Sequence, residues 1–374
     1  MWPYGHGVNR NIRRAITSAK PNWMRNCSGP VREDMKSLLF AAVLGTLLGR
    51  AQTLPTPPAQ PASGPGGTDY LFPDAKMIGP FNSVAGSNAM ATQYYVFEPA
   101  GSTLPASLPV ILFLHGGYAG VEGGYAAGDS PSNYNYWLMH LAKMGYTVVF
   151  PYYDSYLNAD KYSENILDVW EAALEWLGAG QDGVIPPRRD SFGIQTVFVG
   201  HSIGATEALT VAQQLSLNPS GDVPLPRAIA AFTPGIGKTG IPVDFSHISP
   251  YVRLVIVEGS DDPTDQPTAG AIWASVNSAI PAENRDFLQV ISDLHGSPEQ
   301  PGSHWFPDTN GVRDCDDGLD NRDFNVTWKL SVGLADCVLK KKNCAYGLGH
   351  GSEEQIGMGQ WSDGQPVIPM MLMH

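Results

Sequence analysis

The sequence lacks the patterns of several specialised protein classes. Its 374 residues contain no internal repeat, no Cys/His cluster with the spacing of a zinc site and no glycine-rich phosphate loop. These absences exclude a repeat array, and they give no reason to expect a metal or another cofactor. A chain of this length with 43% hydrophobic residues can bury a large core, as globular domains do.

Positive charge is scarce over most of the chain. The first 51 residues carry 8 Lys and Arg against 2 Asp and Glu, which leaves 15 basic and 34 acidic residues in the remainder. Nucleic acids and anionic membranes repel such an acidic body. We therefore expect no nucleic-acid partner. Separately, we expect the protein to be a monomer.

A long apolar run is also missing, because the apolar stretch at residues 37–49 falls short of the roughly 20 residues that a transmembrane helix needs. That stretch follows Met35 and Lys36 and precedes small residues around Ala51, which is the pattern of a signal peptide cleaved before Gln52. We expect residues 1–34 to be an upstream extension, residues 35–51 a signal peptide, and the mature protein to be secreted without a membrane span. The alternative is a cytoplasmic protein in which residues 37–49 form a buried helix.

Residues 52–67 are rich in Pro, Gly and Ser, which predicts a flexible linker. The folded domain is then expected to span residues 68–374.

Cysteine occurs only four times, and one of the four, Cys27, lies in the expected extension. Export would permit a disulfide. Cys337 and Cys344 would close a short loop at the end of a predicted helix, so we expect this pair, with Cys315 unpaired. Three reduced thiols are the alternative.

From residue 68 onward, short apolar runs alternate with helical patterns, which indicates an α/β fold: a mostly parallel sheet with helices on both faces. We expect strands at residues 92–97, 109–114, 146–151, 196–199, 227–232, 252–258 and 286–291, and helices at residues 133–144, 163–177, 203–215, 267–278 and 325–339. Ligands bind at the carboxyl ends of such strands, so the residues that follow each strand are the candidates for chemistry.

The pentapeptide Gly-His-Ser-Ile-Gly at residues 200–204 lies between a predicted strand and a predicted helix. This is the context of a nucleophile elbow, a tight turn that exposes a serine hydroxyl at the top of the sheet. We expect Ser202 to be a nucleophile, the alternative being an ordinary turn serine. A serine needs a histidine base and usually a carboxylate, and in this arrangement they follow in the order Ser, acid, His.

The loop after the strand at residues 252–258 holds three carboxylates. We expect Asp262 to be the acid, with Asp261 as the alternative and Asp265 capping the next helix. After the last strand come His295 and His304. We favour His295 as the base, because it lies only a few residues beyond the strand, and keep His304 as the alternate base.

The strand at residues 109–114 ends in His-Gly-Gly-Tyr-Ala-Gly at residues 115–120, whose glycines let backbone N–H groups point into a site. We expect an oxyanion hole made by the N–H groups of Tyr118 and Ile203. The substrate-binding candidates are Gly117, Trp137, His201 and Trp305.

Together these motifs resemble the α/β-hydrolase superfamily over most of residues 68–346, through residues 115–120, Trp137, the elbow, and the aspartate and histidine loops. Within it the chain is similar to secreted bacterial cutinases and polyester hydrolases, whose Gly-Tyr-Thr-Gly turn matches residues 117–120, and to dienelactone-hydrolase-like esterases. The resemblance implies an α/β-hydrolase fold with little or no lid, and Ser202, Asp262 and His295 as the triad.

Two positions depart from the pattern of the polyester hydrolases. Ile203 stands where those enzymes usually have Met. Their histidine loop is closer to Ser303-His304-Trp305 than to Leu294-His295-Gly296, so the identity of the base stays open.

We therefore expect a secreted serine hydrolase that cleaves carboxylic esters through an acyl-enzyme. The stretch between the strands at residues 227–232 and 252–258 is short and rich in Gly and Pro, so it leaves no room for a helical lid. We expect a site without a lid to admit bulky or polymeric esters. The alternatives are an acyltransferase or peptidase with the same triad, and a non-catalytic binding protein on this fold.

The acidic stretch from Asp314 to Asp323 could bind calcium, because hard cations favour several oxygen ligands on a turn, although its spacing does not match an EF-hand. The alternative is a solvated loop.

Overall fold

The computed structural model divides into two units, Met1–Thr46 and Leu47–His374. The structure describes residues 54–87, 90–117, 130–153, 161–219, 223–236, 243–262, 266–309 and 318–374, all within the second unit. The expected extension at residues 1–34 and the expected signal peptide at residues 35–51 lie outside the described residues.

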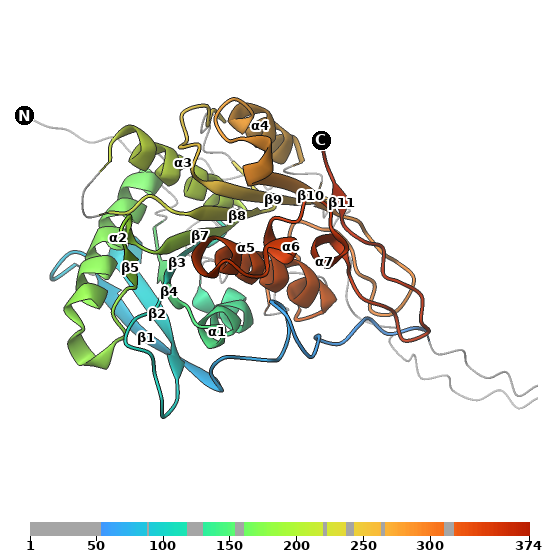
Figure 1. Ribbon diagram of the computed structural model, residues 1–374, viewed down its shortest axis with the longest axis horizontal. Helices are drawn as coiled ribbons and strands as arrows, with labels where there is room; N and C mark the ends of the chain where they lie inside the picture. The colour runs from blue at the N-terminus through green and yellow to red at the C-terminus, as the bar shows by residue number, and fades with distance from the viewer. Residues whose placement is uncertain are drawn as a thin grey trace, which may run out of the picture. The chain divides into compact units, whose positions relative to one another are not determined.

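A nine-stranded mixed sheet forms the centre of the described unit, in the order β1-β2-β4-β3-β7-β8-β9-β10-β11 (Figure 1). Six neighbouring strands, from β4 to β10, run parallel, and the others pair antiparallel at the two edges. The strands are β1 (Asp74–Asn82), β2 (Gln93–Ala100), β3 (Val110–Leu114), β4 (Thr147–Pro151), β7 (Thr196–His201), β8 (Ala228–Phe232), β9 (Arg253–Gly259), β10 (Arg285–Val290) and β11 (Met371–Leu372). The expected α/β class with a mostly parallel sheet is confirmed.

The central strands are apolar along their whole length because both faces of the sheet are covered. All five residues of β3 are fully buried, and they alternate between two cores: Val110, Leu112 and Leu114 face one, while Ile111 and Phe113 face the other. A parallel strand buried on both faces therefore reads as a continuous hydrophobic run.

Helices complete the two cores. The buried residues of α2 (Tyr162–Ala179), α3 (Ile203–Leu217) and α4 (Gln266–Val276) join one core, and those of α1 (Asn135–Lys143) and α5 (Lys329–Lys340) join the other. A π-helical stretch, Asp323–Trp328, leads directly into α5. Within the described ranges no helix combines the length and the apolarity that a membrane crossing requires.

The order of strands in the sheet reverses at β3: the next strand in the chain, β4, lies on one side of β3, and β7 lies on the other. Such a switch leaves a crevice at the carboxyl ends of the strands, because the connections leave to opposite sides. Ser202 follows β7 directly, and Gly116 and Gly117 follow β3. The topology thus brings the two glycine motifs together.

Both edges of the sheet differ from the sequence prediction. The edge strands β1 and β11 were not expected. The separate two-stranded hairpin of β5 (Arg189–Asp190) and β6 (Gly193–Ile194) was not expected either. β1 is mostly exposed and contains Gly79 and Pro80 at an irregularity in its pairing with β2, so it shows neither a continuous apolar run nor a regular alternation. Edge strands carry weaker patterns for this reason.

The prediction of a flexible linker before Thr68 is wrong for residues 54–67, which pack onto the domain. The Pro55 carbonyl accepts from the Ser297 N–H at 2.8 Å, and the Thr56 N–H donates to Ser362 Oγ at 2.9 Å. Gly66 is buried so closely against Phe324 that a Cβ would lie 1.9 Å from its carbonyl oxygen. Prolines lose little backbone entropy on docking and carry no N–H group to satisfy, so a Pro-rich segment can lie against a surface as well as stay free.

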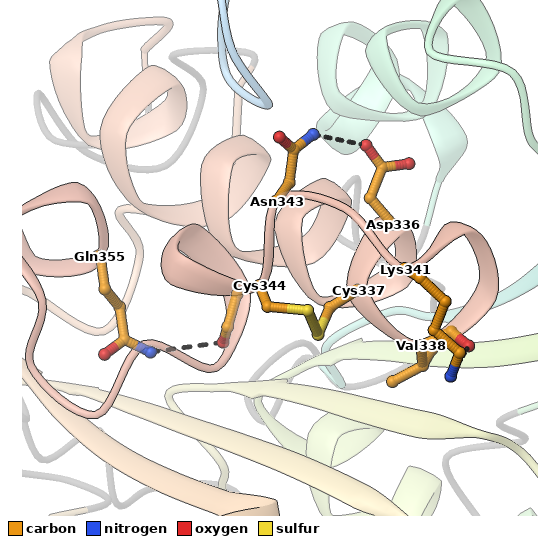
Figure 2. The surroundings of a disulfide bond; sticks show 8 residues. Asp336, Cys337, Val338, Lys341, Asn343, Cys344 and Gln355 are labelled. Atoms are coloured by element: carbon orange, nitrogen blue, oxygen red, sulfur yellow. Dashed lines mark hydrogen bonds between the residues drawn. A yellow bond between two sulfur atoms is a disulfide. The ribbon is translucent and has the colours of Figure 1, made fainter.

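The C-terminal segment is closed by a disulfide between Cys337 and Cys344, as predicted (Figure 2). The loop between them contains Lys341 and Asn343 with φ of 56° and 59°, a conformation that costs energy in residues other than glycine. Beside it, the buried Asp336 carboxylate accepts from Tyr146 Oη at 2.6 Å and from Asn343 Nδ2 at 2.7 Å. Cys315 lies outside the described residues.

Replacing both Cys337 and Cys344 by Ala should lower the free energy of unfolding by about 2.5 kcal/mol, because an eight-residue loop is then free in the unfolded chain. Urea unfolding followed by circular dichroism measures the change. Lys342→Ala is the control, since it removes the exposed partner of an ion pair in the same loop and should cost less than about 1 kcal/mol. Equal losses in the two variants would contradict the prediction.

Glu207 is a buried carboxyl group on α3, 1% exposed, and its Oε2 has no hydrogen-bond partner among the described residues. Burial raises the pKa of Glu207 to about 8. An acid whose pKa is higher in the folded state binds its proton more tightly there. The proton on Glu207 therefore stabilises the folded state fully below about pH 4.5, and this stabilisation is lost as the pH rises to about 8.

Glu207→Gln should consequently become more stable relative to the parent protein as the pH rises. The difference in unfolding free energy should grow by roughly 1.4 kcal/mol per pH unit between pH 5 and pH 8. Chemical unfolding at each pH measures it, with Glu171→Gln, at an exposed position of α2, as the control. A pH-independent difference would refute the assignment.

Candidate active site

The turn at Ser202 joins β7 to α3 with a backbone conformation that side chains rarely adopt. Ser202 has φ of 55° and ψ of −125°. A Cβ on Gly200 would lie 2.4 Å from the Gly204 carbonyl oxygen, and one on Gly204 would lie 2.3 Å from that of Leu114. Both glycines of the pentapeptide are therefore required by close backbone approach, which is the physical reason for the spacing that the sequence displays.

Hydrogen bonds from the neighbouring strand hold this turn. The Ser202 N–H donates to the Phe232 carbonyl at 3.0 Å, and the Gly235 N–H donates to the Ser202 carbonyl at 3.0 Å. The hydroxyl is thereby fixed at the carboxyl end of the sheet, although strain of this kind costs of order 1–3 kcal/mol.

His304 and Asp262 complete a chain of hydrogen bonds from the Ser202 hydroxyl. His304 Nε2 lies 2.9 Å from Ser202 Oγ, and His304 Nδ1 lies 2.7 Å from Asp262 Oδ2. Ser202 and His304 are each 7% exposed and Asp262 is 1% exposed. A carboxylate accepts only, so Nδ1 carries the proton and Nε2 is the acceptor that faces the hydroxyl.

Asp262 follows β9 by three residues, and its N–H donates to the Gly259 carbonyl at 3.3 Å. The alternative acid, Asp261, points elsewhere: its Oδ2 accepts from Ser292 Oγ at 2.7 Å. Asp265 lies outside the described residues. The structure therefore brings the favoured aspartate to the histidine.

The expectation that His295 lies beside Ser202 is wrong. His295 Nε2 lies 2.7 Å from Asp363 Oδ2, in the C-terminal segment, and about a third of the His295 side chain is exposed. The alternate histidine, His304, occupies the place next to the serine.

The path of the chain after β10 explains this difference. Asp293 and Gln300 form an antiparallel bridge, in which the N–H of each residue donates to the carbonyl of the other. Residues 294–299 therefore form a loop that carries His295 away from the sheet. The chain returns at Gly302, whose carbonyl accepts from the Asp261 N–H at 2.8 Å. Gly259 and Gly302 permit this crossing, because a Cβ on Gly259 would lie 2.1 Å from the Gly302 oxygen.

One of the two expected oxyanion donors is described. Ile203 is the first residue of α3, where a backbone N–H has no carbonyl partner one turn earlier in the helix. Gly117 lies against it, since a Cβ there would be 3.1 Å from Ile203 Cγ2. Tyr118 lies outside the described residues.

Three other substrate-binding candidates have different positions. Trp137 is fully buried in the core, between Phe113 and Phe232, and its indole N–H donates to Ser331 Oγ at 3.1 Å. The expectation that Trp137 binds substrate is wrong, because α1 packs this side chain beneath the sheet. Trp305 is half-buried, with its ring 4.7 Å from that of His304.

His201 was also expected to bind substrate, but it is fully buried. Its Nε2 lies 3.0 Å from the His304 carbonyl oxygen, and its Nδ1 lies 2.8 Å from Tyr134 Oη. No sequence motif pointed to Tyr134 or to Thr233. Thr233 Oγ1 donates to the same His304 carbonyl at 3.2 Å.

A second carboxyl group stands near the acid. The pKa of Glu258 is raised to about 7, mainly by burial and in smaller part by the negative charge of Asp262, although the hydrogen bond from Gln289 acts to lower it. Glu258 is therefore partly protonated near neutrality, which limits the negative charge beside the serine–histidine–aspartate chain.

No group of three His, Cys, Asp or Glu side chains suited to a metal ion occurs in the described part of the chain. The first four residues of the suggested calcium stretch, 314–317, lie outside it. The calcium site stays a prediction.

Comparisons of the chain with family models and with curated proteins find no match. The geometry of the site is consequently the basis on which a function can be proposed.

Ser202→Gly should be more stable than Ser202→Ala by about 1 kcal/mol, because glycine adopts a positive φ without strain. Urea unfolding measures the difference. At Glu175, an exposed α2 position, the same comparison should reverse, since Gly is about 1 kcal/mol worse than Ala inside a helix. If Ala were the more stable at both positions, Ser202 would not be strained.

Proposed function

We propose that this protein is a serine hydrolase that cleaves carboxylic esters through an acyl-enzyme. The observation that carries the proposal is the continuous chain from Ser202 Oγ through His304 to Asp262, with contacts of 2.9 and 2.7 Å, built on a strained strand-to-helix turn. A serine hydroxyl is a weak nucleophile by itself, and a histidine base oriented by a carboxylate activates it.

The proposed reaction proceeds in two halves. Ser202 Oγ attacks the ester carbonyl while His304 Nε2 takes the hydroxyl proton, and Asp262 stabilises the resulting imidazolium. The bond to the leaving oxygen breaks, and His304 gives its proton to the departing alcohol. Water then attacks the acyl-enzyme, losing its proton to His304, which returns it to Ser202 as the acid leaves.

The negative oxygen of each tetrahedral intermediate needs hydrogen-bond donors. The Ile203 N–H at the start of α3 is well suited, because the helix dipole also favours negative charge there. The Tyr118 N–H stays the predicted second donor.

Membership of the α/β-hydrolase superfamily is part of the proposal. It is supported by the mostly parallel sheet, by the turn between β7 and α3, and by the chain order Ser202, Asp262, His304. Ser303-His304-Trp305 is also the local sequence that resembles the polyester hydrolases. Secretion is supported by the Cys337–Cys344 disulfide, since such bonds persist in oxidising compartments.

Bulky or polymeric esters are the proposed substrate class. Between β8 and β9, residues 233–236 and 243–252 contain no helix that could act as a lid. Trp305 adds a half-buried aromatic surface next to His304. An aromatic side chain beside the base suits a large acyl or alcohol group.

Hydrolysis of p-nitrophenyl butyrate and of a polyester film tests the proposal. Ser202→Ala and His304→Ala should each reduce kcat by at least about 1000-fold, because members of such a triad act as a unit. His295→Ala should retain kcat within about twofold, since His295 contacts Asp363 and not Ser202.

Equal rates for the parent protein and Ser202→Ala would end the proposal. Loss of activity in His295→Ala with full activity in His304→Ala would reverse the assignment of the base. Cleavage of soluble short-chain esters alone would remove the polymeric substrates.

A further inference from the structure

The residue before the nucleophile, His201, links the histidine loop to the sheet. It ends β7 and is fully buried. The His304 carbonyl near its Nε2 is only an acceptor, so that nitrogen carries a proton and donates across 3.0 Å. Thr233, at the end of β8, donates to the same carbonyl. Two strand ends therefore hold the main chain at His304.

The other side of the His201 ring faces the turn after β3. Nδ1 lies 2.8 Å from Tyr134 Oη, and this oxygen accepts from the Gly116 N–H at 2.9 Å. Gly116 packs closely against both residues, because a Cβ there would lie 3.2 Å from His201 Nδ1 and 3.3 Å from Ser202 Cβ. A single imidazole thus connects the glycine turn that precedes the expected oxyanion donor with the loop that carries the base.

The same ring also lies near a carboxylate of the histidine loop. Asp308 Oδ1 is 3.5 Å from His201 Nδ1, and Asp308 is fully buried. Next to it, Thr309 donates to the Asn133 carbonyl through its N–H at 2.7 Å and through its Oγ1 at 2.9 Å. The contacts of His201 and Thr309 fix both ends of the short segment from His304 to Thr309.

His304 needs such support because it does not lie on a helix or strand. Its loop leaves β10 at Val290 and makes the outward excursion at residues 294–299 before it returns. A general base must be held within about 0.5 Å of its productive position, and displacement by 1 Å can cost roughly 100-fold in rate. The contacts with Ser202 and Asp262 orient the imidazole but leave the backbone to other groups.

We propose that His201 is a positioning residue, which fixes the main chain of His304 and ties it through Tyr134 to the Gly116 turn, so that base and oxyanion donors keep their relative positions. This inference rests on the proposed hydrolase function. His201 does not contact the substrate in this scheme, because it is fully buried beneath the site.

His201→Phe tests the inference in the full-length protein, since it keeps a ring and removes both hydrogen bonds. With p-nitrophenyl butyrate, kcat should fall roughly 10- to 100-fold while KM changes less than about threefold. His201→Gln should recover most of the loss, because its amide N–H reaches the position of Nε2. Tyr134→Phe should give a smaller loss in kcat.

The matched control is His140→Phe. His140 is also a buried histidine whose Nε2 donates to a backbone carbonyl, that of Pro65 at 2.8 Å, and burial lowers its pKa to about 3. It stacks on Trp328, in the core that α1 and α5 cover, and contacts no residue of the proposed triad. This variant should lose stability but keep kcat near that of the parent protein.

A spectroscopic readout makes the test independent of turnover. In protein labelled with ¹⁵N-histidine, the low-field proton on His304 Nδ1 reports its hydrogen bond to Asp262. This signal should broaden or shift in His201→Phe, return in His201→Gln and stay unchanged in His140→Phe.

A kcat of His201→Phe within twofold of that of His140→Phe, or equal losses in His201→Phe and His201→Gln, would overturn the inference. If His201→Phe does not fold, the comparison of kcat between His201→Gln and Tyr134→Phe tests the inference. Full activity in Tyr134→Phe would contradict the link to Gly116. An inactive parent protein would instead refute the hydrolase function, and the His304 signal would still report whether His201 positions that residue.

Discussion

The close approach of two backbones at Ser202 is the constraint on which the rest of the site depends. Gly204 lies directly against the carbonyl of Leu114, so α3 begins as near to β3 as a chain can come. The serine between strand and helix must then take a strained conformation with a positive φ. This arrangement exposes the hydroxyl at the carboxyl end of the sheet and sets the Ile203 N–H next to it. Neither result is possible with a larger residue at position 200 or 204.

Glycine has a second use at the opposite side of the site. Gly259 and Gly302 let the histidine loop cross the end of β9 in backbone contact, so that His304 can reach both Asp262 and Ser202. The loop itself has little regular structure, and its position depends on hydrogen bonds to main-chain groups. A site built partly on loops needs such bonds, because packing alone leaves a loop too mobile for a general base.

Buried ionisable groups accompany this arrangement. Burial raises the pKa of Glu207 on α3 and of Glu258 at the end of β9, so both carboxyl groups reduce stability when they ionise above neutrality. Asp262, by contrast, is paired with a histidine at 2.7 Å. Glu207 Oε2, in contrast to Asp262 Oδ2, has no hydrogen-bond partner among the described residues. Functional sites commonly carry strain and buried charge of this kind.

The sequence by itself determined the parallel sheet, the helices between its strands, and the elbow at Ser202, because these features depend on local apolar patterns and on glycines at fixed spacing. It also indicated Asp262, which lies within three residues of its strand. Only the tertiary structure decided which of His295 and His304 lies beside Ser202, since the excursion of the loop is set by the pairing of Asp293 with Gln300. The burial of Trp137 and of His201, and the packing of residues 54–67, likewise depend on partners far away in the chain, which no local pattern records.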